Sequence, residues 1–212
     1  MGIAIEVHEL SVSVDGSPLL GETSFTLDRG RCLAVRGDNG SGKTTLLRVL
    51  AGLQPPSTGT ATVLDLAADE RRPAFRRAVA GLVGAPPFAR DLTVGEHLRL
   101  VALTWGGDRD DADRAAAEVL GEMGLELLEH RFVHQLSSGQ TQLFSLALTL
   151  VRPAEVILLD EPEQRLDPDR LRRVEEALRR RIRAGATVVM ATHDPDLAAA
   201  LADQTLTLTG AA

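Results

Sequence analysis

The sequence has little of several things that would place it in other classes of protein. It contains one cysteine in 212 residues, no tyrosine, and only 3% aromatic residues. A single cysteine excludes a disulfide framework and a zinc site built from cysteines. We expect Cys32, within the strand-like RCLAVR, to be a small buried apolar residue. No apolar run approaches the ~20 residues that a membrane-spanning helix needs.

The chain is also poor in positive charge. Its formal net charge is −7, and its basic residues form no cluster that is rich in aromatics. This argues against nucleic acid as the main partner. The basic run at 179–183 could form a local patch, although a solvated helix face is the favoured interpretation. The N-terminal MGIAIEVHEL lacks a signal-peptide pattern, so we expect a cytoplasmic protein that can lie against a membrane protein.

What the chain does contain predicts a well-packed α/β domain. Apolar residues make up 44% and charged residues 25%, so a sizeable core can form. Alternating or continuous apolar stretches predict strands at 3–8, 10–14, 23–27, 31–36, 60–63, 79–84, 154–160, 186–193 and 204–209. The turns DGSP and LDRG separate the first of them. Helical patterns cover 43–51, 93–105, 111–124, 138–151, 167–185 and 195–203. Strand–helix alternation at both ends implies a largely parallel sheet with helices on both faces.

A glycine-rich loop links the expected strand 31–36 to the expected helix 43–51. Its pattern, G-x-x-x-x-G-K-[ST], is typical of phosphate-binding loops. Glycine lets the backbone curl so that its N–H groups point at phosphate oxygens, and the helix N-terminus adds partial positive charge. We expect Lys43 to bind the outer phosphates and Thr44 to be a Mg²⁺ ligand. The nucleotide-binding residues that the loop predicts are Gly37, Asp38, Asn39, Gly40, Ser41, Gly42, Lys43, Thr44 and Thr45.

An apolar strand that ends in two carboxylates supplies the second half of such a site. Four aliphatic residues at 156–159 precede Asp160 and Glu161. Asp160 would hold Mg²⁺ through water, because Mg²⁺ keeps several of its waters. Glu161 follows on the loop, where it can polarise the attacking water as a general base. Two exposed turn carboxylates are the alternative, which the buried aliphatic residues disfavour.

Five short segments together point to one family. They are, in order along the chain, GDNGSGKTT (37–45), LSSGQ (136–140), ILLDEP (157–162), LDP (166–168) and ATHD (191–194). On these segments the chain resembles the ATP-binding subunit of an ABC transporter over essentially its whole length. The resemblance implies an α/β fold of the P-loop NTPase class, with a RecA-like, mainly parallel sheet core, an N-terminal antiparallel β subdomain and an inserted α-helical subdomain. It implies a single domain, 1–212, in which 1–87 and 151–212 form the nucleotide-binding core and about 88–150 the helical subdomain.

The resemblance also implies roles for single positions. It implies a phosphate-binding lysine and two Mg²⁺ ligands at Lys43, Thr44 and Asp160. Glu161 matches the catalytic carboxylate, and His193 matches a switch histidine that contacts the γ-phosphate and the catalytic centre. A surface histidine is the alternative for His193. Asp167 matches an aspartate at a dimer interface, and capping the helix that begins at Pro168 is the other role open to it.

The LSSGQ segment implies that the site is shared between two chains. In an ABC-type dimer this signature closes over the ATP that the other subunit holds. Ser137 offers a hydroxyl, Gly139 permits close backbone approach, and the following helix directs its N-terminus at the phosphate. A simple helix cap is the alternative. The residues expected to contact the partner's ATP are Ser137, Ser138, Gly139 and Gln140.

The implied function is an ATPase that uses ATP and Mg²⁺ to drive a separate integral membrane permease. The chain would lie in the cytoplasm, peripheral on the inner face of the cell membrane. An identical chain is the favoured second ABC ATPase subunit, and a different one is the alternative. The helical insertion is the expected docking surface, with Trp105 a candidate contact, and LTVGEHL is similar to export-type ATPases. A weakly hydrolysing regulatory half of a heterodimeric transporter, or a non-transport ABC ATPase acting on DNA or ribosomes, are the competing functions.

Four positions depart from the family pattern. Val14 stands where an aromatic residue usually stacks on adenine, so we expect loose adenine binding and poor base selectivity. Ala85 stands where a glutamine usually contacts Mg²⁺. Ser138 replaces a glycine, which is tolerable unless the position needs a positive φ. Arg165 is bulkier than the usual residue near the dimer interface. We expect hydrolysis to survive these changes.

Overall fold

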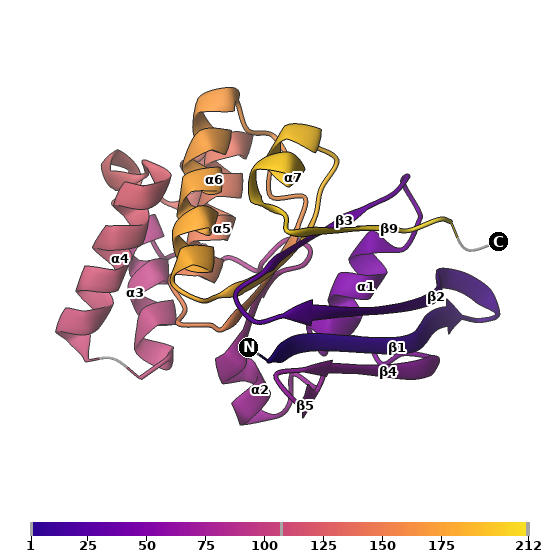
Figure 1. Ribbon diagram of the computed structural model, residues 1–212. Helices are drawn as coiled ribbons and strands as arrows, with labels where there is room; N and C mark the ends of the chain where they lie inside the picture. The colour runs from indigo at the N-terminus through magenta and orange to yellow at the C-terminus, as the bar shows by residue number, and fades with distance from the viewer. Residues whose placement is uncertain (1, 107, 211–212) are drawn as a thin grey trace.

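Two β-sheets of different character organise the chain (Figure 1), which the computed structural model describes over residues 2–106 and 108–210. The antiparallel strands are β1 (Ile3–Val14), β2 (Ser17–Asp28), β4 (Thr58–Val63) and β5 (Leu66–Ala67), in the order β2-β1-β4-β5. The parallel strands are β3 (Cys32–Arg36), β6 (Val79–Leu82), β7 (Val156–Asp160), β8 (Thr187–Ala191) and β9 (Gln204–Thr207), in the order β6-β7-β8-β3-β9. The predicted P-loop NTPase architecture, a parallel core with an N-terminal antiparallel sheet, is confirmed.

The N-terminal strands are longer than the sequence predicts. Segments 3–8 and 10–14 belong to one strand, β1, and the strand predicted at 23–27 begins at Ser17. The expectation of separate short strands is therefore wrong. The irregularity lies at Glu9, which has a positive φ of 46° and donates its N–H to Ser24 Oγ at 2.8 Å. Such a bulge shifts the register without ending the strand.

The strands of the parallel sheet are apolar throughout because both faces are buried. Successive residues of a strand point to opposite faces. In β3, Cys32 and Ala34 pack on the face that α5 and α6 cover, whereas Leu33 and Val35 pack on the face toward α1. Burial raises the pKa of the Cys32 thiol to about 12, and nearby Asp203 acts in the same direction. Cys32 is thus the buried residue that the sequence predicts.

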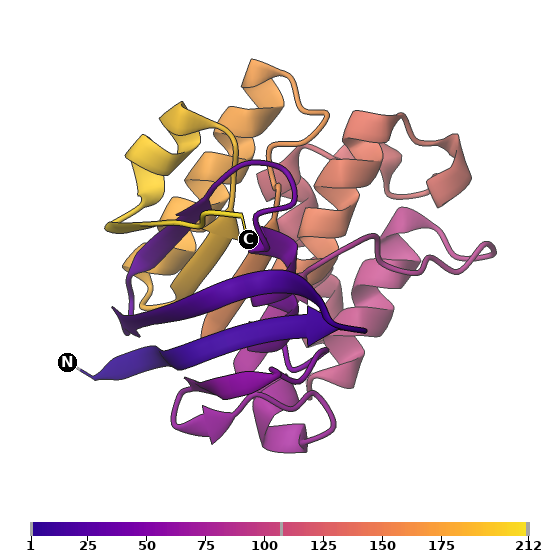
Figure 2. The same cartoon turned by 90° about the vertical axis from the view of Figure 1, so that its right-hand side faces the viewer.

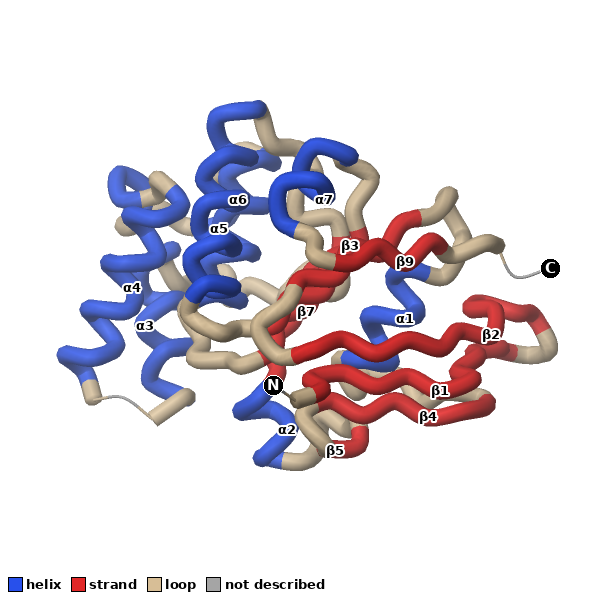
Figure 3. Tube along the Cα trace, viewed as in Figure 1, coloured by secondary structure: helices blue, strands red, loops and turns tan. Residues whose placement is uncertain are grey.

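The helices lie on two sides of the parallel sheet (Figure 3). They are α1 (Lys43–Leu50), α2 (Pro73–Ala78), α3 (Val94–Thr104), α4 (Arg109–Met123), α5 (Ser138–Leu150), α6 (Pro168–Arg183) and α7 (Pro195–Leu201), with 3₁₀ turns at Glu126–Leu128 and Val133–Gln135. Helix α1 packs between the two sheets, and α2 lies beside β6 on the same side (Figure 2). On the opposite face, α5 and α6 pack against the parallel sheet and α7 packs on α6, whereas α3 and α4 lie outside α5 and α6 (Figure 1). The short helix α2 is absent from the sequence expectations, although Pro73 occupies its first position, where proline is favoured.

The helices predicted within the insertion, at 93–105, 111–124 and 138–151, correspond to α3, α4 and α5. Their buried side chains are continuous with those under the parallel sheet, so the insertion shares the main core. Phe144 of α5 is fully buried and stacks on Phe88, with ring centroids 5.4 Å apart. This contact anchors the segment that follows β6 beside the helices. The subdomain boundaries at 88 and 150 stay a prediction. Among the described residues, no helix has the length and apolar character needed to cross a membrane.

Candidate active site

The loop between β3 and α1 has a conformation that only glycine accommodates at two positions. Gly37 has a φ of 148°, and a Cβ there would lie 2.4 Å from Leu208 O and 2.5 Å from Ser41 Oγ. Gly42 has a φ of 99°, and no side chain caps the N-terminus of α1 that it precedes. Ser41 Oγ is buried without a hydrogen-bond partner among the described residues. The loop is therefore a cradle of backbone N–H groups with an unsatisfied hydroxyl, which fits phosphate oxygens.

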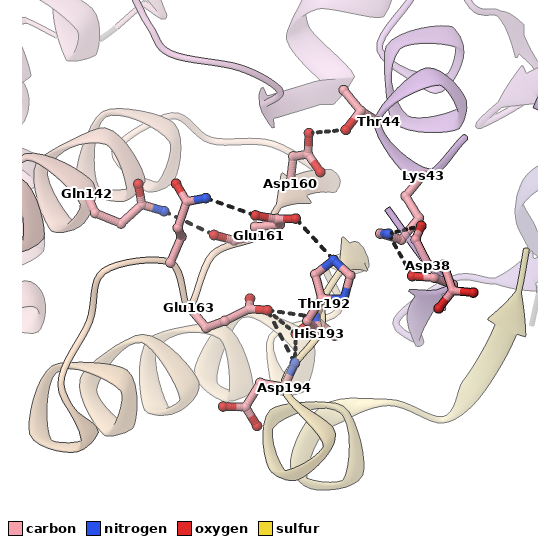
Figure 4. Close-up of polar contacts among 12 residues, drawn as sticks. Asp38, Lys43, Thr44, Gln142, Asp160, Glu161, Glu163, Thr192, His193 and Asp194 are labelled. Atoms are coloured by element: carbon pink, nitrogen blue, oxygen red, sulfur yellow. Dashed lines mark hydrogen bonds and ion pairs between the residues drawn. The ribbon is translucent and has the colours of Figure 1, made fainter. Parts of the chain in front are cut away.

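Lys43 is held inside this cradle. Its side chain is largely buried, with 6% of the residue exposed. The Nζ atom donates to Gly37 O at 2.8 Å and to Asp38 O at 2.9 Å (Figure 4). Two carbonyl oxygens compensate its charge only in part, and no carboxylate forms an ion pair with it among the described residues. An ammonium group in this position can bind an anionic ligand as a point charge.

Thr44 and Asp160 meet across the ends of α1 and β7. Thr44 Oγ1 donates to Asp160 Oδ2 at 2.8 Å (Figure 4). Burial raises the pKa of the Asp160 carboxyl above its ordinary value of 3.8, against the opposing effect of the Thr44 hydrogen bond. The adjacent Glu161 carboxylate also raises it. A hydroxyl and an under-compensated carboxylate are oxygen ligands of the kind Mg²⁺ takes, so the pair fits this ion.

The strain on Asp160 predicts that Asp160→Asn stabilises the protein in the absence of nucleotide and Mg²⁺. The folded-state pKa is raised, so the ionised carboxylate destabilises the fold at neutral pH, and protonation relieves this as pH falls. We expect a gain of about 1 kcal/mol in unfolding free energy near neutral pH. Urea unfolding of both proteins would show the gain shrinking as the pH falls through the raised folded-state pKa toward the ordinary value of 3.8. A gain that is equal at both pH values would contradict the assignment.

Glu161 lies next to His193 at the carboxyl ends of β7 and β8. His193 Nε2 is 3.3 Å from Glu161 Oε1, and both side chains are partly exposed (Figure 4). Glu161 has a left-handed φ of 49°, which places its side chain on the loop just beyond Asp160. Its N–H donates to Ala191 O at 2.9 Å, which ties the turn to β8. A carboxylate held in this way beside an imidazole can accept a proton from water.

The signature residues lie at the N-terminus of α5 and bond to each other. Ser137 Oγ accepts from Gln140 N at 3.3 Å, and Ser137 N donates to Gln140 Oε1 at 2.8 Å. This is a capping box, so the helix-cap geometry is present. Ser138 is the first helical residue and lacks a positive φ, so serine is compatible with this position. Among the described residues, no hydrogen bond or ion pair joins 137–140 to 37–45.

Gly139 and Asp167 connect the signature to the start of α6. A Cβ on Gly139 would lie 2.8 Å from Arg165 O, so glycine is needed for packing within the chain itself. Asp167 is the N-cap of α6 and accepts from Arg170 N at 2.9 Å. The predicted cap is therefore confirmed, whereas a dimer-interface role for Asp167 stays a prediction. Arg165 has a φ of 63° and is exposed.

Ala85, at the place of the expected glutamine, faces the same site. It lines a cavity of about 320 Å³ together with Thr44, Asp160 and Glu161. An alanine side chain offers no ligand to a metal ion. The base-stacking position, Val14, is 47% exposed at the end of β1, and weak adenine selectivity stays a prediction.

Three polar residues near Glu161 were missed by the sequence analysis. The Gln142 side-chain amide donates to Glu161 O at 3.2 Å, and the Gln164 amide donates to Glu161 Oε2 at 3.0 Å. Glu163 accepts hydrogen bonds from the loop after β8. Their only sequence signal is the presence of long polar side chains immediately after two recognisable segments.

Trp105 has a partner within the chain. The Arg152 guanidinium carbon lies 4.0 Å from the centre of the Trp105 ring. Arg152 also donates to Arg76 O at 2.8 Å and to Val79 O at 2.9 Å, and burial lowers its pKa. Trp105 therefore helps to join α3 to the end of α2 and β6.

Comparisons with known proteins show the family of the chain. A family model described as "ABC transporter" matches residues 20–164. The Nod factor export ATP-binding protein I of Sinorhizobium fredii is 32% identical over 95% of this chain, which spans 59% of that relative's length. The cytochrome c biogenesis ATP-binding export protein CcmA of Xanthomonas axonopodis pv. citri is 34% identical over 98% of this chain and 95% of its own.

A solved structure matches the fold across nearly the whole chain. An ATP-binding subunit of an ABC transporter superposes with a TM-score of 0.89 at 27% identity, covering 98% of this chain and 86% of the other. Family, sequence and fold thus agree with the resemblance drawn from the five short segments. The chain belongs to the ABC transporter family and is an ATP-binding, ATP-hydrolysing subunit of that family.

Proposed function

We propose that two ATP-bound copies of this chain close on each other, hydrolyse ATP and thereby drive export through a separate membrane permease. Residues 37–45 hold the phosphates of ATP, with Lys43 at the outer phosphates. Thr44 and Asp160 hold Mg²⁺, which neutralises charge on the phosphates when bound. The chain is cytoplasmic and peripheral on the inner face of the membrane through its permease.

The main support for the proposal is that three parts of the site lie at the same edge of the parallel sheet. The phosphate cradle, the Thr44–Asp160 pair and the Glu161–His193 pair all follow the carboxyl ends of neighbouring parallel strands, β3, β7 and β8. In open α/β sheets, ligands bind at this edge. One edge of the sheet therefore holds a cation for the phosphates, oxygen ligands for Mg²⁺ and a base for water. A single bound nucleotide can contact all three.

Glu161 and His193 perform the chemical step in this proposal. Glu161 orients the attacking water and accepts its proton as the bond to the γ-phosphate breaks. His193 contacts the γ-phosphate and holds the Glu161 carboxylate from the side, as its 3.3 Å distance to Oε1 supports. Lys43 balances the negative charge on the phosphates.

The second subunit supplies the signature. Ser137–Gln140 lie at a helix N-terminus, whose backbone N–H groups favour an anion. Among the described residues, no hydrogen bond or ion pair joins them to residues 37–45 of the same chain, so an ATP held by the partner is the ligand we assign to them. An identical partner is the simplest assembly, because C2 pairing then completes two equal sites.

The permease docks on the helical insertion in this proposal. Helix α3 exposes Leu100 and Leu103, at 52% and 41%. Both curated relatives carry "export" in their names, which favours an exporter. Co-purification of the chain from its native membranes would identify the permease, and recovery with a ribosome or DNA instead would contradict the transport role.

An ATP-dependent dimer is the test of the proposal. Glu161→Gln keeps the shape of the side chain but cannot accept a proton, so ATP with Mg²⁺ is expected to convert the variant from monomer to a stable dimer in light scattering. The matched control is Glu155→Gln, an exposed glutamate at the opposite end of β7, which should behave as wild type. A Glu161→Gln chain that binds ATP and stays monomeric would overturn the proposal.

A further inference from the structure

The carboxylate of Glu161 is held on both oxygens. His193 Nε2 lies 3.3 Å from Oε1, and the Gln164 amide donates to Oε2 at 3.0 Å. Gln164 also donates its backbone N–H to Glu161 O at 3.1 Å, which closes the turn between them. Glu161 lies on a loop and has a left-handed backbone conformation. Its side chain is nevertheless fixed by contacts from two directions.

The neighbouring Glu163 fixes the other member of the pair. Its Oε1 accepts from Thr192 Oγ1 at 2.7 Å, from His193 N at 2.8 Å and from Asp194 N at 3.3 Å (Figure 4). Its Oε2 is buried and has no partner among the described residues. A carboxylate with one buried, unsatisfied oxygen carries a desolvation cost, which the hydrogen bonds to its other oxygen offset.

We propose that Glu163 and Gln164 are positioning residues that together set the geometry between Glu161 and His193. Gln164 holds the side chain of Glu161, while Glu163 holds the backbone of His193. Because the two are adjacent in sequence, one short segment of chain fixes both members of the pair. The inference rests on the proposed function, which gives Glu161 and His193 their roles in hydrolysis.

Gln164 can be substituted without unfolding the protein, because its side chain is exposed. Gln164→Glu keeps the shape, removes the donor and places a second negative charge beside Glu161. Gln164→Ala removes the donor alone. We expect kcat for ATP hydrolysis to fall about 3–10-fold in the alanine variant and by at least about tenfold more in the glutamate variant. KM for ATP should stay within about twofold, because contacts to the phosphates are unchanged.

The matched control is Gln204→Glu. It makes the same chemical change on an exposed residue of β9 that pairs with Leu33, at the end of the sheet away from the site. This control is expected to keep wild-type kcat. A Gln164→Glu variant with wild-type kcat, or one equal to Gln164→Ala, would overturn the inference.

Glu163 provides a second, independent readout. Glu163→Gln keeps an oxygen that can accept the same hydrogen bonds, whereas Glu163→Ala removes it. We expect Glu163→Ala to lower kcat about tenfold and Glu163→Gln to restore most of that loss. In NMR spectra of the imidazole nitrogens, the His193 signal should move in Glu163→Ala and keep its wild-type position in Glu163→Gln. An unmoved signal in a folded Glu163→Ala would contradict the role assigned to Glu163.

Two results distinguish the proposed role of Glu161 in hydrolysis from the positioning roles of Glu163 and Gln164. If Glu161→Gln hydrolyses ATP normally, the catalytic role that the proposed function gives to Glu161 is wrong. If Glu161→Gln is inactive and Gln164→Glu is fully active, only the positioning inference is wrong.

Discussion

Replacing Glu161 by glutamine is expected to lower kcat for ATP hydrolysis by about 10²–10⁴-fold, the usual worth of a positioned general base. The amide preserves the size of the side chain and can still accept a hydrogen bond, but it has no basic oxygen for the proton of water. The 3.3 Å contact with His193 and the 3.0 Å contact with Gln164 hold the wild-type carboxylate at the site. Binding of ATP should survive, because the phosphate cradle is untouched.

Steady-state release of phosphate measures this effect, with ATP affinity determined separately. Glu155→Gln, which makes the same change at the far end of β7, controls for the loss of one negative charge. A Glu161→Gln variant within about threefold of wild type would mean that another group takes the proton, against the general-base assignment.

Lys43→Ala is expected to weaken ATP binding by about 100-fold, or close to 3 kcal/mol. Lys43 is the cation inside the cradle, 6% exposed, and charge-assisted contacts of this kind are strong when water is excluded. The substitution also removes the hydrogen bonds to Gly37 O and Asp38 O that hold the loop in shape. Lys43→Arg should recover only part of the affinity, because its planar head replaces a compact ammonium group.

Isothermal titration with ATP and Mg²⁺ gives the affinity directly. Arg48→Ala is the matched control, since it removes an exposed cation from the same helix, α1. If Lys43→Ala and Arg48→Ala weaken ATP binding equally, the effect comes from net charge. The assignment of Lys43 to the phosphate site would then be wrong.

Much of the site is predictable from the sequence because its parts are local. The spacing of Gly37, Gly42 and Lys43 specifies the cradle within one loop, and the structure gives those glycines positive φ values. The apolar run of β7 similarly specifies where Asp160 and Glu161 emerge. The cradle and the two carboxylates depend on residues that are close in sequence, so a sequence pattern is enough to predict them.

The contacts that complete the site depend on tertiary neighbours instead. Glu163 finds its donors because β7 and β8 are adjacent in the sheet, a pairing between residues some thirty positions apart. Gln142 reaches Glu161 O because α5 packs beside β6, the neighbour of β7 in the sheet. The bulge at Glu9 likewise joins two predicted strands without any glycine to signal a positive φ.

In the proposed dimer each active site is built from two chains, and mixing two defective variants reveals whether this is so. Lys43→Ala has a defective cradle and an intact signature. Ser138→Glu has an intact cradle, and it places a negative charge on an exposed signature residue, where we propose that the partner's phosphate binds. A mixed dimer therefore contains one complete site, formed by the cradle of the second chain and the signature of the first.

Each variant alone should hydrolyse ATP poorly, and an equal mixture should regain about a quarter of wild-type activity, as random C2 pairing gives one good site in half of the dimers. Phosphate release from the mixture, compared with the sum of the separate variants, is the measurement. A mixture no more active than that sum, or a Ser138→Glu variant that is fully active alone, would contradict a site shared between two chains.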